Sequence, residues 1–160
     1  MIRLQFSYTE DIGSAVIRYF GHGAGWSHVD AMLPDGNLLG SRNDTNVVDG
    51  KTYGPGVQIR PPGYKKFALI RRINLLAPPG MTADFYDFLN AQVGKPYDKT
   101  AIWGFAAGRD WRTPDSWFCS ELQTAALEKC GWFPWPLASP ENKIDPDDLY
   151  LAISAREQLA

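Results

Sequence analysis

The chain carries one of its two cysteines in the stretch Trp117-Phe118-Cys119-Ser120-Glu121-Leu122, which is predicted to begin a helix. In the first turn of a helix, unpaired backbone N–H groups and the positive end of the helix dipole lower the pKa of a thiol. Cys119 therefore occupies a position suited to a thiolate nucleophile. Small or apolar residues follow at i+3, i+7 and i+11, so Cys119 is explained equally well as a member of a buried helix stripe.

One of the two histidines, His28, lies far upstream on a predicted strand. A cysteine and a histidine that are distant in sequence can meet in a fold, and together they are the minimum parts of a thiol hydrolase. Asp30 leaves the same face of the strand as His28, so its carboxylate can orient the imidazole. The alternatives are an outward-facing, solvated pair of His28 and Asp30, and a hydrogen-bonded His28 without a catalytic role. Ser41, at the end of the next strand, is the other polar residue placed roughly opposite His28.

The composition indicates one ordinary globular domain over residues 1–160. Hydrophobic residues make up 44% and charged residues 21% of the chain, and the formal net charge is −2. No basic run suggests a surface that follows phosphates, so we do not expect a nucleic-acid partner. The beginning of the chain lacks the apolar segment of a signal peptide, and no window approaches the roughly 20 apolar residues of a membrane span. A cytoplasmic location is the simplest expectation.

The two cysteines are not expected to form a disulfide. On one helix, Cys119 and Cys130 would lie roughly 16 Å apart, well beyond the roughly 7 Å that a disulfide allows between Cα atoms. Two free thiols favour a reducing compartment. The two cysteines and two histidines match no zinc spacing, so we expect neither a metal nor a cofactor.

The pattern of residues predicts an α+β protein, because strands gather in the first half and helices in the second. The predicted strands are Ile2–Tyr8, Ser27–Leu33, Leu38–Ser41 and Phe67–Ile73, with a tight turn over Pro34–Asn37. Residues 42–65 are predicted to be irregular, with short strand pieces near Val47 and Val57.

Five helices are predicted from apolar spacing and from residues that cap helix ends. They are residues 11–20, a helix capped by Thr82 that runs to Val93, residues 100–107, a helix from Cys119 to Lys129 capped by Asp115 or Ser116, and a helix from Pro146 to Ala155 capped by Asp145.

Three short motifs, in this order, carry a resemblance to a known family. They are Ser27-His28-Val29-Asp30 followed by Asp35-Gly36, then Gly94-Lys95-Pro96-Tyr97-Asp98, then Phe118-Cys119-Ser120-Glu121-Leu122. Together they resemble the circularly permuted NlpC/P60 (papain-like) superfamily, near the YiiX-like hydrolases and phage or prophage relatives of cell-wall hydrolases. The resemblance covers about residues 25 to 150. It implies a small antiparallel sheet or barrel packed against helices, and a cytoplasmic or virion-associated protein.

The resemblance also implies roles for individual residues. Cys119 matches the nucleophile and His28 the general base. The residues that would line the oxyanion site and the substrate are Tyr97, Ser27, Trp26 and Glu121. Relatives usually carry a histidine, asparagine or glutamate about twelve residues after the base, where this chain has Gly40. The residue that orients His28 is therefore Asp30, Ser41 or none.

The expected reaction is acyl transfer to Cys119 followed by hydrolysis of an amide or peptide bond. A peptide or small amide is the expected substrate, and the resemblance implies a cell-wall peptide. Its acyltransferase branch suggests a lipid acyl group as a variant. The rival hypothesis is a catalytically silent binding or virion-associated module that keeps the fold and holds a ligand in an aromatic cleft.

Overall fold

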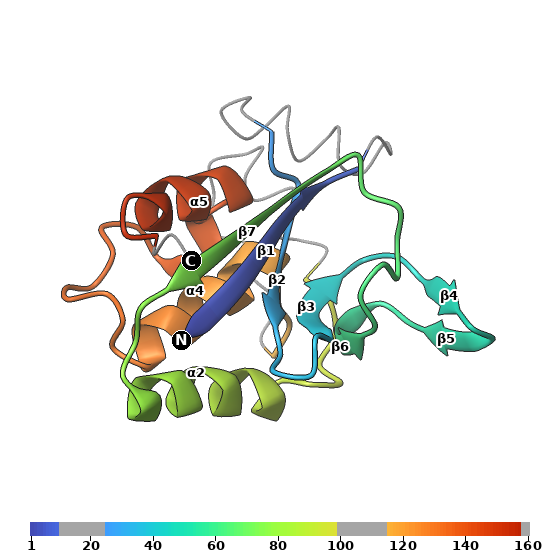
Figure 1. Ribbon diagram of the computed structural model, residues 1–160, viewed down its shortest axis with the longest axis horizontal. Coiled ribbons are helices and arrows are strands. Elements are labelled where there is room, and N and C mark those ends of the chain that lie inside the picture. Colours follow the sequence, from blue (N-terminus) through green and yellow to red (C-terminus); the bar gives the residue numbers. More distant parts are fainter. Residues whose placement is uncertain (10–24, 99–114, 158–160) are drawn as a thin grey trace.

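The computed structural model describes residues 1–9, 25–98 and 115–157, which form a mixed α+β fold around a five-stranded antiparallel sheet (Figure 1). The strand order is β6-β3-β2-β1-β7. The strands are β1 (Ile2–Tyr8), β2 (His28–Met32), β3 (Leu38–Arg42), β6 (Gly56–Arg60) and β7 (Leu69–Leu75). The α+β prediction is confirmed. Within the described ranges β6 and β7 are the two edges, so the sheet is open and does not close into a barrel.

A second, two-stranded sheet, β4 (Asn46–Val48) with β5 (Lys51–Tyr53), projects away from the main sheet (Figure 1). The expected strand piece near Val47 is β4. The piece near Val57 is β6, a full strand of the main sheet that pairs with β3. β5 was not expected, because its side chains are largely exposed and leave no apolar alternation in the sequence.

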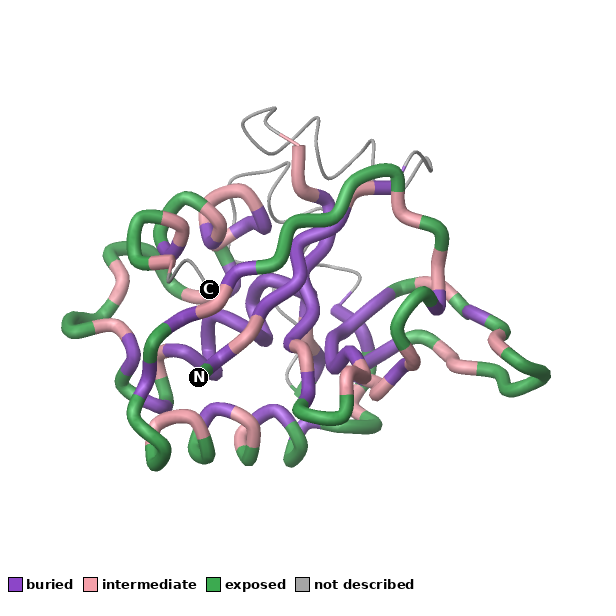
Figure 2. The backbone as a smooth tube through the Cα atoms, viewed as in Figure 1, coloured by how far each residue is buried: buried purple, intermediate pink, exposed green. Residues whose placement is uncertain are grey.

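The two faces of the sheet differ in chemistry although both are buried at β1 and β2 (Figure 2). Phe6 lies opposite Val29, and this face is apolar and continuous with the hydrophobic core. Ser7 lies opposite His28 and Gln5 opposite Asp30, and these four side chains are polar and buried. Because side chains alternate along a strand, His28 and Asp30 leave β2 on the face away from Val29.

Within the described residues, three α-helices and one short 3-10 helix accompany the sheet. They are α2 (Pro79–Ala91), α4 (Cys119–Lys129), η1 (Glu141–Lys143) and α5 (Pro146–Ser154). α4 is the central one, in contact with β2, β3, α2, η1 and α5. None of the helices in the described part of the chain has the length and apolar character that a membrane crossing requires. The predicted helices over 11–20 and 100–107 lie outside the described residues.

At the ends of α5 and α2, one capping prediction is confirmed and the other is wrong. Asp145 caps α5 as expected, because its Oδ1 accepts a hydrogen bond from Asp148 N at 2.7 Å. Thr82 does not cap α2, which begins earlier, at Pro79. Proline is favoured at that position because the first helical N–H has no partner to lose. The Thr82 hydroxyl instead accepts from the N-terminal amine of Met1 at 3.0 Å.

The hydrophobic face of α2 provides a test of the core. Phe85 is fully buried, whereas Phe88 on the same helix is only partly buried. Phe85→Ala should lower the free energy of unfolding by about 3–5 kcal/mol, because it leaves a cavity in the core. Phe88→Ala is the matched control and should cost clearly less. Urea unfolding of both variants measures the difference, and equal losses would contradict this arrangement of the core.

Candidate active site

The beginning of α4 lies where β2 and β3 stop pairing. The ladder between these strands runs only over Met32 with Leu38 and Ala31 with Leu39. Beyond it, the backbone N–H of Val29 is close enough to the Cys119 thiol to lower its pKa. The Ser41 hydroxyl donates to the backbone oxygen of Trp117 at 2.7 Å. A hydrogen bond from β3 thus holds the segment before the helix, and α4 packs against both β2 and β3.

The first turn of α4 is held by a contact that the sequence did not predict. The N-cap residue is Phe118, not Asp115 or Ser116, and its side chain cannot accept a hydrogen bond. Glu121 supplies the acceptor, since its Oε2 takes the Phe118 N–H at 3.1 Å in a buried setting. Glu121, which the resemblance implied would line the substrate, therefore has a structural contact at the start of α4.

The His28 ring is bonded to Asp30. Its Nε2 lies 2.8 Å from Asp30 Oδ1, and the two residues are 5% and 1% exposed. A carboxylate only accepts, so Nε2 carries the proton and Nδ1 keeps the lone pair. Within the described residues the ring's hydrogen bonds all involve Nε2, with Asp30 and Tyr64 as the partners. Of the two candidates for the orienting residue, Asp30 contacts His28, whereas the hydroxyl of Ser41 bonds to Trp117.

Gly40 leaves the space that the Asp30 carboxylate occupies. A Cβ built at position 40 would overlap Asp30 Oδ1 and would also meet the backbone oxygen of Val29 at 3.3 Å. Position 40 is also where the resemblance led us to look for a third polar residue. Here the neighbouring strand supplies no side chain, and a carboxylate from the histidine's own strand fills the position instead.

Buried charges set the protonation of this pair. Burial would raise the pKa of Asp30, but His28, Arg42 and Arg60 together hold it below its ordinary value. Burial lowers the pKa of His28, and the two arginines add to that effect while Asp30 opposes it. Asp30 is thus ionised and His28 neutral at pH 7, which is the combination that a general base requires.

The Cys119 thiol is neutral as well. The residue is 1% exposed, and burial raises the pKa of its thiol to about 12. The Val29 N–H and the Arg42 charge lower that pKa, but less than burial raises it. The expectation of a low thiol pKa at the helix start is therefore wrong for this arrangement of the chain. Cys119 belongs to the hydrophobic core together with Leu122 and Ala126, as the stripe hypothesis expected.

Cys119 and His28 have no hydrogen bond between them among the described residues. Cys119 belongs to the core cluster that contains Val29, whereas the His28 side chain leaves β2 on the face away from Val29. Asp30 and Arg42, which surround His28, also influence the thiol. An approach of Sγ to the ring within about 4 Å stays a prediction.

Tyr97 lies beside Cys119. Burial raises the pKa of its hydroxyl, and the neighbouring Cys119 adds to that effect. Its ring is 5.8 Å from that of Phe118, and a parallel bridge joins Tyr97 to Trp117. The residue that the resemblance implied would line the oxyanion site is therefore next to the thiol.

Trp26 and Ser27 anchor the start of β2. The Trp26 N–H donates to Asp147 Oδ1 at 3.0 Å, and the indole is 5.4 Å from the Tyr150 ring. The Ser27 N–H donates to Ser7 O at 3.1 Å. These contacts join the strand to α5 and β1, and they position His28 indirectly.

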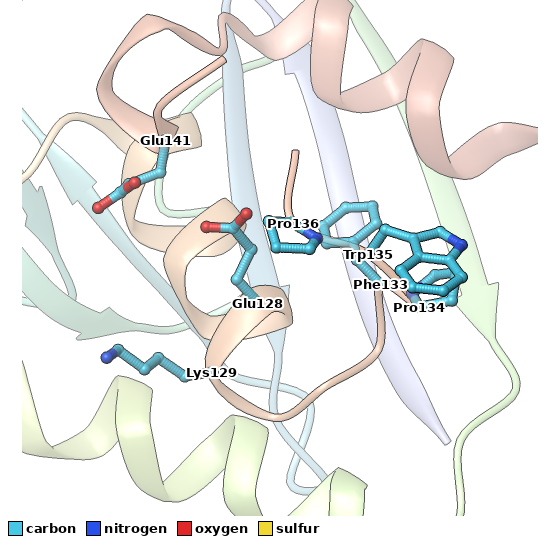
Figure 3. Close-up of a pocket in the computed structure, with 7 residues that line it drawn as sticks. All are labelled: Glu128, Lys129, Phe133, Pro134, Trp135, Pro136 and Glu141. Carbon is cyan, nitrogen blue, oxygen red and sulfur yellow. The ribbon is translucent and has the colours of Figure 1, made fainter. Parts of the chain in front are cut away.

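A pocket of about 460 Å³ lies at the other end of α4 (Figure 3). It is lined by Glu128, Lys129, Glu141 and the stretch Phe133–Pro136. Its volume suits a small ligand, but roughly 15 Å of helix separates Glu128 from Cys119. The pocket is therefore separate from the candidate active site. Within the described ranges no three histidine, cysteine or acidic side chains gather as metal ligands.

Three residues of the site were not predicted from the sequence. Tyr64 follows a Pro-Pro-Gly turn in a segment without periodicity, and Arg42 and Arg60 end their strands. Arg42 lies two residues after Gly40, on the face that meets Asp30. Alternation along β3 would have placed a cation near the carboxylate had that strand been predicted to its full length.

No protein-family model matches this chain, and no curated protein matches it.

The lowered pKa of His28 predicts how stability depends on pH. The unfolded chain binds a proton at His28 near pH 6.5, whereas the folded chain does so only at lower pH. The free energy of unfolding should therefore fall as the pH is lowered from about 7 to about 5. His28→Gln should make this slope shallower, as measured by urea unfolding at a series of pH values. An unchanged slope would contradict the lowered pKa.

Proposed function

We propose that this protein is a thiol hydrolase that cleaves an amide or peptide bond through Cys119, His28 and Asp30. The observation that carries the proposal is the buried 2.8 Å bond between His28 Nε2 and Asp30 Oδ1. This bond keeps Nδ1 as the basic nitrogen. The order of the three motifs supports the same assignment and the permuted NlpC/P60 fold.

The reaction begins from a neutral pair. Nδ1 of His28 takes the proton from Sγ as the sulfur attacks the carbonyl carbon, and the leaving amine then takes that proton. Water attacks the resulting thioester, gives a proton to Nδ1, and releases the acid while Sγ regains the proton. The Cys119 backbone N–H and the Tyr97 hydroxyl are the candidates for stabilising the oxyanion. A substrate must displace the groups that cover the thiol, because Cys119 is 1% exposed.

The substrate class follows from the resemblance. A peptide or small amide is the proposed substrate, with cell-wall peptides as the first choice and a lipid acyl group as the variant. A cytoplasmic or phage-associated location is proposed on the same basis.

A second function, a catalytically silent binding or virion-associated module, is favoured by one specific observation. Burial of Cys119 raises its thiol pKa to about 12, which suits a core residue better than a nucleophile. In such a module the polar cluster around His28 would serve the fold alone.

The small acyl donor p-nitrophenyl acetate separates the two functions. The hydrolase should release nitrophenolate and acquire one acetyl group on Cys119, detected by mass spectrometry of the peptides. Cys119→Ala should lose the acetyl group, and His28→Ala should slow its formation at least a hundredfold, because general base catalysis contributes about 10²–10⁴. Cys130→Ala is the matched control, a buried free cysteine at the other end of α4, and should react like wild type.

Two treatments of the wild-type protein complete this test. The acylation should survive EDTA and stop after alkylation by iodoacetamide. Inhibition by EDTA that zinc reverses, or an unlabelled Cys119 in the folded wild type, would rule out the proposed hydrolase.

The orienting residue has its own test. Asp30→Asn should slow acylation and shift the acid limb of its pH profile to lower pH, because removing the carboxylate lowers the pKa of His28. Ser41→Ala removes a hydroxyl that bonds to Trp117 and should leave that limb in place. A shifted limb in Ser41→Ala with an unshifted one in Asp30→Asn would reverse the assignment.

A further inference from the structure

The Tyr64 hydroxyl is the meeting point of the polar groups around His28. It donates to Asp30 Oδ2 at 2.9 Å and lies 3.3 Å from His28 Nε2. It also accepts from Arg42 Nη1 at 3.3 Å. The two carboxylate oxygens of Asp30 are therefore divided, one on the imidazole and one on the phenol.

Two guanidinium groups hold the Tyr64 ring in place. The central carbons of Arg42 and Arg60 lie 5.6 and 5.5 Å from the ring centroid, within the range of a cation–π contact. Each arginine is itself fixed. Arg42 makes two bonds to Asp44, at 2.7 and 3.0 Å, and Lys65 also bonds to that carboxylate.

Arg60 joins the same cluster to the backbone of neighbouring segments through hydrogen bonds. Its Nη1 donates to Gly40 O at 3.0 Å, and its Nη2 reaches the backbone oxygens of Gly54 and Gly56. Gly40 is also the residue whose missing side chain makes room for the Asp30 carboxylate. The Asp30 carboxylate is thus held in position between the backbone at Gly40 and the Tyr64 hydroxyl, which bonds to its oxygen Oδ2.

We infer that Tyr64 is a positioning residue for His28, acting through Asp30. This inference rests on the proposed function, in which Nδ1 of His28 is the base. By holding Oδ2, the hydroxyl keeps Oδ1 directed at Nε2, and this keeps the proton on Nε2. It also shares the negative charge of Asp30, so that the imidazole stays neutral before the reaction.

The charged and titratable groups around His28 come from three strands and one connecting segment. They are Asp30 on β2, Arg42 on β3, Arg60 on β6, and Tyr64 in the segment between β6 and β7. Of these, only Tyr64 can lose its polar group with little change of shape, as phenylalanine. Tyr64→Phe is therefore the cleanest change to the cluster.

Tyr64→Phe should raise the pKa of His28 by roughly half a unit, because more of the Asp30 charge then acts on the imidazole. Acylation of Cys119 by p-nitrophenyl acetate should slow about tenfold, the effect of one hydrogen bond. NMR titration of the His28 ring, assigned with His22→Gln, measures the pKa. Tyr86→Phe is the matched control, since it removes another partly buried hydroxyl, bonded to Met32 O at 2.8 Å, and should leave the His28 titration unchanged.

The wild-type protein provides a second measurement that needs no variant to fold. Ring nitrogen shifts should report the Nε2–H tautomer of His28, and this proton should show a nuclear Overhauser effect to Tyr64. The Nδ1–H tautomer, the absence of that effect, or an unshifted His28 pKa in folded Tyr64→Phe would overturn the inference. A wild type with the expected tautomer and shift but no acylation of Cys119 would overturn the proposed function alone.

Discussion

The end of the ladder between β2 and β3 is the constraint from which the site follows. Backbone groups that leave a sheet must find other partners, and here the start of α4 supplies them. The Val29 N–H lies close enough to the Cys119 thiol to lower its pKa, and Trp117 O accepts from the Ser41 hydroxyl. A helix placed in this way presents its first residue to the strand that carries His28. The same placement buries the thiol and raises its pKa.

Charge buried on the second face of the sheet is costly, which argues that it serves more than stability. Asp30 and Arg60 are almost fully buried, and the Arg60 Nε has no hydrogen-bond partner in the described part of the chain. Replacing a buried ionic cluster by apolar side chains is often neutral or stabilising, so such a cluster is weak evidence for stability. Strongly perturbed ionisable groups gather at functional sites, and here one of them is the only described histidine.

The sequence predicted the parts of the fold that depend on local chemistry. The hairpin at Pro34–Asn37, α4 and the Asp145 cap each follow from turn formers, apolar spacing or a capping carboxylate. Contacts between distant segments were out of reach, such as Tyr64 over Asp30 or the empty position at Gly40. The thiol pKa was predicted wrongly because two effects differ in size. A helix terminus contributes about 0.3–1 kcal/mol, which lowers a pKa by less than one unit. Burial instead raises the pKa of the Cys119 thiol from 9.0 to about 12.

In the proposed reaction, the neutral state of Cys119 and His28 determines at which step the polar groups around His28 act. If thiol and imidazole are both uncharged, the proton moves only as the sulfur attacks, and the positive charge on His28 exists only from then on. Asp30 stabilises that charge, while Arg42 and Arg60 oppose it. If Asp30 raised the pKa of His28 too little, His28 would be a poor base. If it raised that pKa too much, His28 would already be protonated before the substrate binds. The hydroxyl of Tyr64 bonds to both Asp30, which raises the pKa of His28, and Arg42, which lowers it. In the proposed hydrolase, the second face of the sheet therefore contributes to the reaction through the basicity of Nδ1, without touching the substrate.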